Sequence, residues 1–344
     1  MNCRVAITHA HLRRVADVRR RSGLLLAVVA AAPLAANAAE PADVGIEWVT
    51  VGNPGNAPDP ATARGGVAGV FQISKHEVTA GQYAAFLSAV AASDPHGLWH
   101  RIDRAGKAGA FTYAARKGEE RMPMTHVAFL DCMRFANWLH HVESDPAAGG
   151  PAKSPADAAR LTETGAYAIA AGGGLAARES GARAWIPNED EWYKAAYHHP
   201  HAAGGPPGHY WRYPTRSDAV PTIGKPGDTG PNVGIYIVDW LKPGGISPVG
   251  SLPGCLSHYG TLDQGGSVWE WIEATVFDAQ RVLRGGSALT THEKMLKQAR
   301  SNVPPSRRYP DVGFRVARAA PPPTAPAPEA KPAPEAKPVS EAKP

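Results

Sequence analysis

Glycine and proline interrupt this 344-residue chain so often that long regular elements are excluded over most of its length. The sequence has 36 glycines and 33 prolines, and from residue 44 to Arg318 three stretches show the period of an amphipathic helix. Short alternating segments and turns fill the rest. This pattern predicts one α+β domain with many loops. So high a share of loop needs a stabilising interaction inside the domain to hold it rigid.

The three helical stretches carry recognisable start signals or apolar faces. Thr79 with Gln82, and Asn188 with Glu191, form two capping boxes. The third stretch, residues 129–141, repeats apolar residues at helical spacing. Short strands are predicted where the sequence alternates, in SVWEW, RVLRG and VGFRVAR.

Residues 1–38 have the three regions of an export signal. A basic region is followed by the apolar run GLLLAVVAAAPLAA, and ANA supplies small residues before Ala39. The run is too short to span a bilayer, and no later segment is apolar enough. We therefore predict a signal peptide at 1–38 and an exported protein, periplasmic or secreted, that does not span the membrane. The alternative is a surface helix in a cytosolic protein.

The net charge of +5 comes from the predicted signal. Removing its six arginines and one aspartate from 36 basic and 31 acidic residues leaves 30 of each, so nucleic-acid binding is not predicted. At the other end, residues 319–344 are rich in alanine and proline and contain EAKP three times. They are predicted to form a disordered tail.

Few cysteines are present for an exported protein. Cys3 leaves with the signal, so Cys132 and Cys255 either form one bridge or remain a core thiol and a loop thiol. The second interpretation is favoured, because Cys132 lies on an apolar helix face. A Cys255–His258 pair is a further alternative for covalent chemistry.

Five stretches occur in the order seen in the sulfatase-modifying-factor family, which contains the formylglycine-generating enzymes. They are FQISKHEVTAGQYAAFL, IPNEDEWYKAAY, YGTLDQGGSVWEW, VLRGGS and VGFRVAR. The chain resembles this family over roughly residues 44–318. The resemblance implies a single loop-rich, C-type-lectin-like α+β domain at residues 39–318, with short helices and short antiparallel strands.

Formylglycine-generating enzymes, which this chain resembles, oxidise a sulfatase cysteine with molecular oxygen. They bind copper(I) through two cysteines that follow the Gly-Gly-Ser motif, and copper(I) requires thiolates. Here Thr290 takes the place of the first cysteine, and Met295 lies near the second. Copper is therefore not supported, and no formylglycine-generating activity is expected.

A second branch of the family uses non-haem iron held by an H-x3-H-x-E motif in a separate helical domain. The nearest approach here is His96, His100 and Asp103, but Pro95 and Gly97 predict a loop. Solvated loop histidines are the favoured interpretation there and in the HHPH run at 198–201. Iron is therefore not supported either.

The resemblance also implies a calcium site in the stretch DQGGSVWEW. Its ligands are the side chain of Asp263, the carbonyls of Gly266 and Val268, and the carboxylate of Glu270. Two negative charges on so tight a turn repel each other, and a divalent cation removes that cost. The alternative is that Glu270 forms a salt bridge with an arginine such as Arg315.

A second family-like site implies Asn232 and the carbonyl of Val233 as ligands, with Asp239 available. The overall prediction is an exported, non-catalytic or repurposed family member. It acts as a calcium-stabilised binding or envelope-associated module for an unidentified protein, peptide or carbohydrate. The alternative is a metal-dependent oxidoreductase that uses copper or non-haem iron through unrecognised ligands.

Overall fold

The computed structural model describes residues 44–170, 177–237, 245–277 and 280–321. The predicted signal peptide, most of the predicted tail, and Asp239 lie outside these ranges.

The three predicted helices are present, and two of them begin at the predicted caps. Helix α1 (Ala80–Val90) follows Thr79, and helix α4 (Glu189–Tyr197) follows Asn188, each with a complete capping box. The longest helix, α2 (Phe129–Ser144), buries all the residues of its predicted apolar face. Start signals and periodicity therefore located these helices correctly.

A fourth helix, α3 (Pro155–Glu163), goes beyond the expectation of three. The hydroxyl of Ser154 caps it by accepting from the backbone N–H of Asp157 at 3.1 Å. Only Leu161 and Thr162 are buried, so the helix has no apolar stripe for periodicity to detect. The shorter 3-10 helices are η1 (Pro146–Gly149), η2 (His201–Ala203) and η3 (His292–Met295).

Two four-stranded sheets form the centre of the domain. The first has the order β1 (Trp48–Val51), β2 (Phe71–Ser74), β12 (Ala317–Ala319), β5 (Ala184–Trp185). The second has the order β10 (Ser301–Val303), β9 (Gln280–Arg284), β8 (Trp269–Val276), β11 (Val312–Phe314). Two smaller pairs are β3 (Ile102–Ala105) with β4 (Thr112–Ala115), and β6 (Thr222–Ile223) with β7 (Val233–Gly234).

Most strand pairs are antiparallel, as expected, but β8–β11 and β6–β7 are parallel. The parallel pairing of β8 with β11 places Gly313 opposite Glu270. The segment that precedes β11 therefore runs beside the end of the loop that precedes β8, and the N–H of Trp269 donates to the carbonyl of Asp311 at 2.9 Å. Arg315 directly follows β11, and its side chain reaches Glu270 and the carbonyl of Leu262 at the predicted calcium loop.

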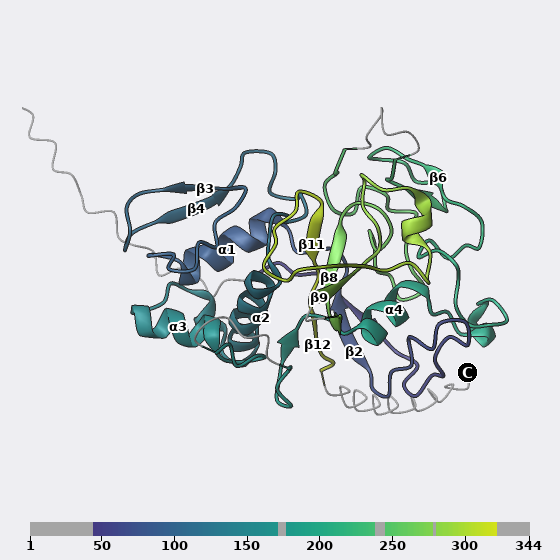
Figure 1. Cartoon of the computed structure of the whole chain (residues 1–344), viewed down its shortest axis with the longest axis horizontal. Helices are drawn as coiled ribbons and strands as arrows, with labels where there is room; N and C mark the ends of the chain where they lie inside the picture. The colour runs from purple at the N-terminus through teal and green to yellow at the C-terminus, as the bar shows by residue number, and fades with distance from the viewer. Residues whose placement is uncertain (1–43, 171–176, 238–244, 278–279, 322–344) are drawn as a thin grey trace, which may run out of the picture. The chain divides into compact units, whose positions relative to one another are not determined.

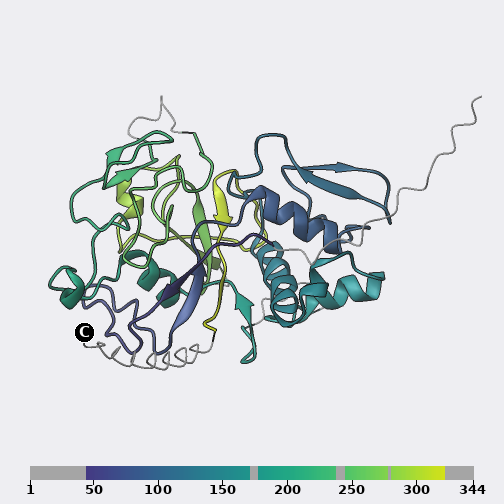
Figure 2. The same cartoon turned by 180° about the vertical axis from the view of Figure 1, so that it is seen from behind.

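Helices α1 to α3 lie together on one side of β8, β11 and β12, and α4 lies on the other (Figures 1 and 2). On the first side, the rings of Phe135 in α2 and Phe314 in β11 meet edge to face at 5.3 Å. On the second side, Trp192 of α4 packs with Ile272 and Val282. The second sheet is therefore buried on both faces, which fixes the strand that carries Glu270.

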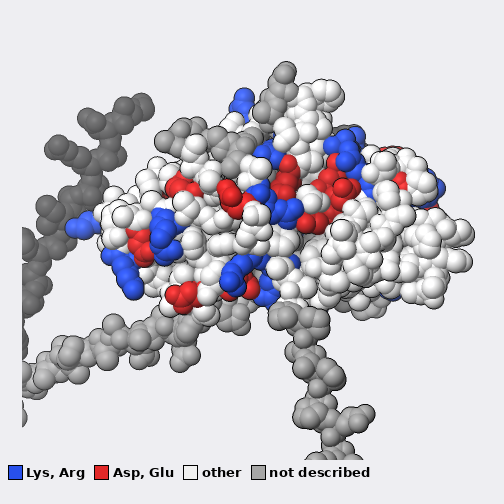
Figure 3. Space-filling view, turned by 90° about the horizontal axis from the view of Figure 1, so that it is seen from below, with Lys and Arg blue, Asp and Glu red and all other residues white. Residues whose placement is uncertain are grey.

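No helix among the described residues is long and apolar enough to cross a membrane. The face drawn in Figure 3 has basic and acidic side chains interspersed, without a continuous basic stripe. This agrees with the equal numbers of basic and acidic residues outside the predicted signal.

Candidate functional site

Glu270 lies near the start of β8, in the middle of the second sheet. Its neighbours Trp269 and Trp271 expose 6% and 0% of their surface, as expected for core residues. Glu270 itself exposes 0%, because β11 lies alongside it and α4 covers it. A carboxylate buried this completely needs partners for both of its oxygens.

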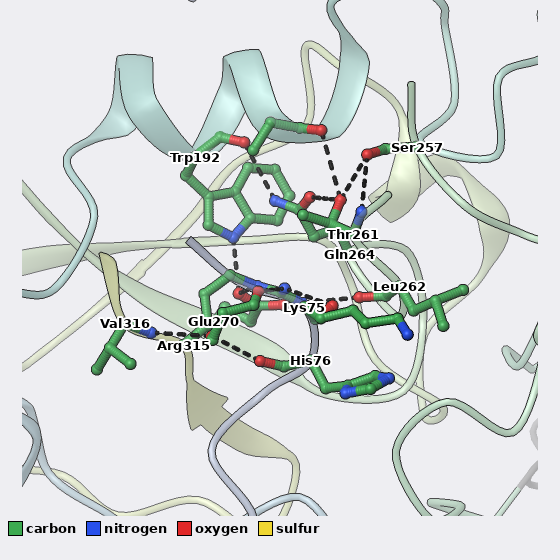
Figure 4. A network of polar contacts seen from close by, with 12 residues as sticks. Lys75, His76, Trp192, Ser257, Thr261, Leu262, Gln264, Glu270, Arg315 and Val316 are labelled. Atoms are coloured by element: carbon green, nitrogen blue, oxygen red, sulfur yellow. Dashed lines mark hydrogen bonds and ion pairs between the residues drawn. The ribbon is translucent and has the colours of Figure 1, made fainter. Parts of the chain in front are cut away.

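Arg315 and Trp192 supply those partners (Figure 4). The Nε of Arg315 lies 2.6 Å from Oε2 of Glu270, and its Nη2 lies 2.8 Å from Oε1, so the ion pair is bidentate. The indole N–H of Trp192 donates to Oε2 at 2.7 Å. The salt bridge weighed against a calcium ligand in the sequence is therefore present.

Arg315 also joins segments that are distant in the sequence. Its other hydrogen bonds go to the carbonyl oxygens of Ser74 at 2.9 Å, Lys75 at 3.3 Å and Leu262 at 2.9 Å. Ser74 ends β2, and Leu262 directly precedes the predicted calcium loop. One buried side chain therefore holds β2, β8 and this loop together.

The predicted calcium loop begins at Asp263, whose backbone is left-handed with a φ of 64°. Its Oδ2 accepts from the backbone N–H of Gly250 at 2.7 Å, and burial raises its pKa to about 6. Outside the strand ladders, the carbonyl oxygens of Gly266 and Val268 accept no hydrogen bond from the described residues. These oxygens are chemically suitable calcium ligands.

Glu77 brings a third carboxylate to this cluster. It exposes 1% of its surface in the turn between β2 and α1, and neither of its oxygens has a hydrogen-bond partner among the described residues. Burial, and next the charges of Asp263 and Glu270, raise the pKa of Glu77 well above its ordinary value. Glu77 does not stand out in the sequence, because an acid two residues before an N-cap is typical of a solvated helix start.

The Asn232 side chain, a predicted ligand of the second site, makes hydrogen bonds within the protein. The side-chain oxygen of Asn232 accepts from the hydroxyl of Thr215 at 2.6 Å. Its amide nitrogen donates to the carbonyls of Ala219 and Val220, both at 3.3 Å. Val233 is buried in β7, and its N–H donates to the sulfur of Cys255 at 3.2 Å. These contacts give Asn232 a structural role in holding its turn.

Thr290 and Met295, which the family resemblance places at the first copper-binding cysteine and near the second, are built into the fold. The hydroxyl of Thr290 accepts from the N–H of Ser287 at 2.8 Å and donates to its carbonyl at 3.0 Å, closing a tight turn. Met295 exposes 0% of its surface. Its methyl group packs so closely on Gly234 and Gly265 that a Cβ at either glycine would lie 2.9 Å away. Neither position presents a thiolate to a metal.

Both described cysteines are free and buried, which confirms the preference for separate thiols over a bridge. Cys132 lies on the buried face of α2 and exposes 0% of its surface. Burial raises the pKa of its thiol well above the ordinary value. Cys255 makes polar contacts with Val233 and Gly230, while the His258 ring stacks on His199 at 4.0 Å. The proposed Cys–His pair is therefore absent from the part of the chain that the structure describes.

The histidine motifs do not converge on a metal. His96 lies in a loop, as expected, with its Nε2 3.1 Å from Oε1 of Glu163, whereas Asp103 lies in β3 and pairs with Arg116. His198 differs from the expectation of a solvated histidine, because it exposes only 3% and burial lowers its pKa to about 3. Among the described residues, no three His, Cys, Asp or Glu side chains are grouped to hold a metal ion.

A comparison with protein families matches residues 49–320 to the sulfatase-modifying factor enzyme 1-like domain. The chain belongs to this family. The match covers most of the chain, so it confirms the resemblance found in the sequence and the expected α+β class.

The chain is similar to several solved structures at about a fifth sequence identity. CarF shares 21% identity with a TM-score of 0.51, covering 80% of this chain and 99% of its own. Variable protein 1 of Treponema denticola shares 17% identity with a TM-score of 0.44, covering 79% and 95%. PvdO from Pseudomonas aeruginosa shares 20% identity with a TM-score of 0.43, covering 80% and 92%. A search of functionally curated proteins found no significant match.

Proposed function

We propose that this protein is an exported family member without formylglycine-generating activity, acting as a calcium-stabilised binding module. The observation that carries the proposal is the structural use of Thr290 and Met295 where the copper enzymes have thiolates. Copper(I) needs soft sulfur ligands, and a hydroxyl fixed in a turn does not replace one. An extracytoplasmic protein, peptide or carbohydrate is the proposed class of ligand, by analogy with lectin-like folds.

The catalytic part of this proposal has a direct test. The purified protein, incubated with copper(I), oxygen and a peptide carrying the sulfatase cysteine motif, should form no aldehyde detectable by mass spectrometry. A formylglycine-generating enzyme with both thiols, run in parallel, is the positive control. Aldehyde above the level of a protein-free reaction contradicts the proposal, as does stoichiometric copper or iron in protein purified without chelator.

The calcium part rests on the charge of the buried cluster. Glu77, Asp263 and Glu270 carry three negative charges when ionised, and Arg315 balances one of them. One Ca²⁺ makes the cluster neutral. Asp263, the two loop carbonyls and Glu270 would hold the ion. The charge of Glu77 acts on Arg315 and contributes to raising the pKa of that guanidinium.

We expect the substitution Glu77→Gln to separate the roles of calcium and of protonation. In chelator, it should raise the free energy of unfolding by about 1–3 kcal/mol, because it removes a buried charge without a partner. In calcium, wild type should gain about 2.7 kcal/mol at an ion concentration of 100 times the Kd, and the variant should gain clearly less. Denaturant unfolding with and without calcium measures both changes.

Glu119→Gln is the matched control for this experiment, since Glu119 is 36% exposed in a surface pair with Arg101. It should change neither the stability in chelator nor the gain from calcium by more than about 0.5 kcal/mol. A wild type that gains nothing from calcium contradicts the calcium proposal. That result leaves the absence of formylglycine-generating activity to its own test.

A further inference from the structure

A polar cavity lies between the start of α2 and strands β8 and β9. None of its lining residues belongs to the predicted calcium loop. It has a volume of about 310 Å³, which is enough for a small ligand. Its lining includes Phe129, Tyr167 and Arg281, which expose 1%, 1% and 6% of their surface. Ala177 and Thr275 also line it and are exposed. The cavity therefore leads from solvent to a buried polar floor.

Arg281 is a buried cation without a carboxylate partner among the described residues. Its Nη1 donates to the backbone carbonyl of Glu273, while its buried Nε has no hydrogen-bond partner. The guanidinium carbon lies 4.3 Å from the ring centroid of Phe129. A guanidinium has five N–H donors, and burying them unpaired is unfavourable. This side chain therefore has donors available to a bound molecule.

The other polar groups of the cavity satisfy one another. Arg178 pairs with Glu191 at 3.0 Å and with Glu273 at 3.3 Å, and the hydroxyl of Tyr167 donates to Glu273 at 2.5 Å. Both Arg178 and Tyr167 contact the carboxyl group of Glu273, whereas Arg281 makes no ion pair among the described residues. Its Nε therefore remains available to a bound molecule.

A β-bulge creates this arrangement. The register of β8 and β9 shifts between Trp271 and Thr275, and the N–H of Glu273 donates instead to the carbonyl of Pro187 at 3.0 Å. Beyond the shift, Arg281 pairs with Thr275. Bulges change the direction of side chains and are common beside functional sites. Here the bulge accompanies the opening of space in front of a buried arginine.

We propose that this cavity binds a small organic molecule through one carboxylate group held by Arg281. The planar fork of the guanidinium matches a carboxylate, and this guanidinium has an unpartnered Nε and no ion pair of its own among the described residues. A phosphate dianion fits less well, because the carboxyl group of Glu273 borders the same cavity and repels a second charge. Phe129 offers an apolar surface to the rest of the molecule. The proposal is independent of calcium and of the missing thiols.

Sodium benzoate is a suitable probe, since it joins one carboxylate to an apolar ring. Isothermal titration should show saturable binding of benzoate to the wild-type protein at constant ionic strength set with sodium chloride. Arg281→Met should weaken this binding by about 10- to 100-fold. It should not lower the melting temperature in sodium chloride alone, because removing a buried cation without a carboxylate partner offsets the loss of its hydrogen bond to the carbonyl of Glu273.

Two further variants keep the test decisive if Arg281→Met fails to fold. Arg281→Lys keeps the charge but loses the fork, so its affinity for benzoate should lie between those of wild type and Arg281→Met. Arg116→Met removes a 48% exposed arginine elsewhere and should bind benzoate like wild type. Absence of saturable binding, or unchanged affinity in the Arg281 variants, overturns the site. Tighter binding of inorganic phosphate than of benzoate overturns the carboxylate assignment.

Discussion

Replacing Arg315 with methionine is expected to lower the free energy of unfolding by at least about 3–5 kcal/mol. The change leaves the fully buried carboxylate of Glu270 with Trp192 as its single remaining donor. It also removes the hydrogen bonds to the carbonyls of Ser74 and Leu262. Denaturant unfolding of the folded fraction measures the loss, and a variant that does not fold at 25 °C meets the same expectation.

A surface arginine and a double variant separate charge burial from general packing. Arg116→Met removes an exposed pair with Asp103, so it should cost no more than about 1 kcal/mol. The double variant Arg315→Met with Glu270→Gln removes both buried charges and should be more stable than Arg315→Met alone, because no unpaired carboxylate remains at position 270. A loss below about 1 kcal/mol in Arg315→Met contradicts this account of the cluster.

Local sequence rules predicted the elements whose causes are local. The capping boxes at Thr79 and Asn188 marked the starts of α1 and α4, and the apolar period placed Cys132 in the core. The same rules missed α3, which buries only Leu161 and Thr162 and depends on its cap and its propensity. Periodicity detects a buried face, and it fails where a helix has almost none.

The candidate site was predicted only in part, because it depends on contacts between distant segments. Sequence analysis identified Glu270 and named Arg315 as its alternative partner, and the two lie in contact. Glu77 was not identified, because it is buried by segments that are distant in the sequence. The N–H of its neighbour Val78, for example, donates to the carbonyl of Phe314 in β11. Packing decides which acid pairs with Arg315, the buried arginine of this cluster, and no spacing in the sequence encodes that choice.

Arg281 illustrates the same limit. In the sequence it belongs to RVLRG, an alternating segment that predicts an ordinary strand, and β9 does form there. The cavity arises from the register shift opposite it, between Trp271 and Thr275, which alternation does not reveal. A buried unpaired cation becomes visible only when all of its neighbours are known.

Gly266→Ala is expected to be among the most damaging changes in the chain, with a loss of at least about 4 kcal/mol in the free energy of unfolding. The backbone φ of Gly266 is 81°, which disfavours any residue with a Cβ. A Cβ there would also lie 2.2 Å from the carbonyl oxygen of Ile235, which accepts from the N–H of Ser267 at 3.2 Å. Chemical denaturation gives the loss directly.

Gly260→Ala is the control that separates the steric part of this loss from the part due to the backbone conformation. Gly260 has a similar φ of 93°, but its nearest neighbour to an added Cβ is a methyl group of Val49 at 3.6 Å. It should therefore lose only about 1–2 kcal/mol from the backbone conformation. The difference between the two alanine variants measures the clash with the Ile235 carbonyl. Equal losses would mean that the turn at Gly266 relaxes freely, and a turn that loose could not hold its carbonyl in place for calcium.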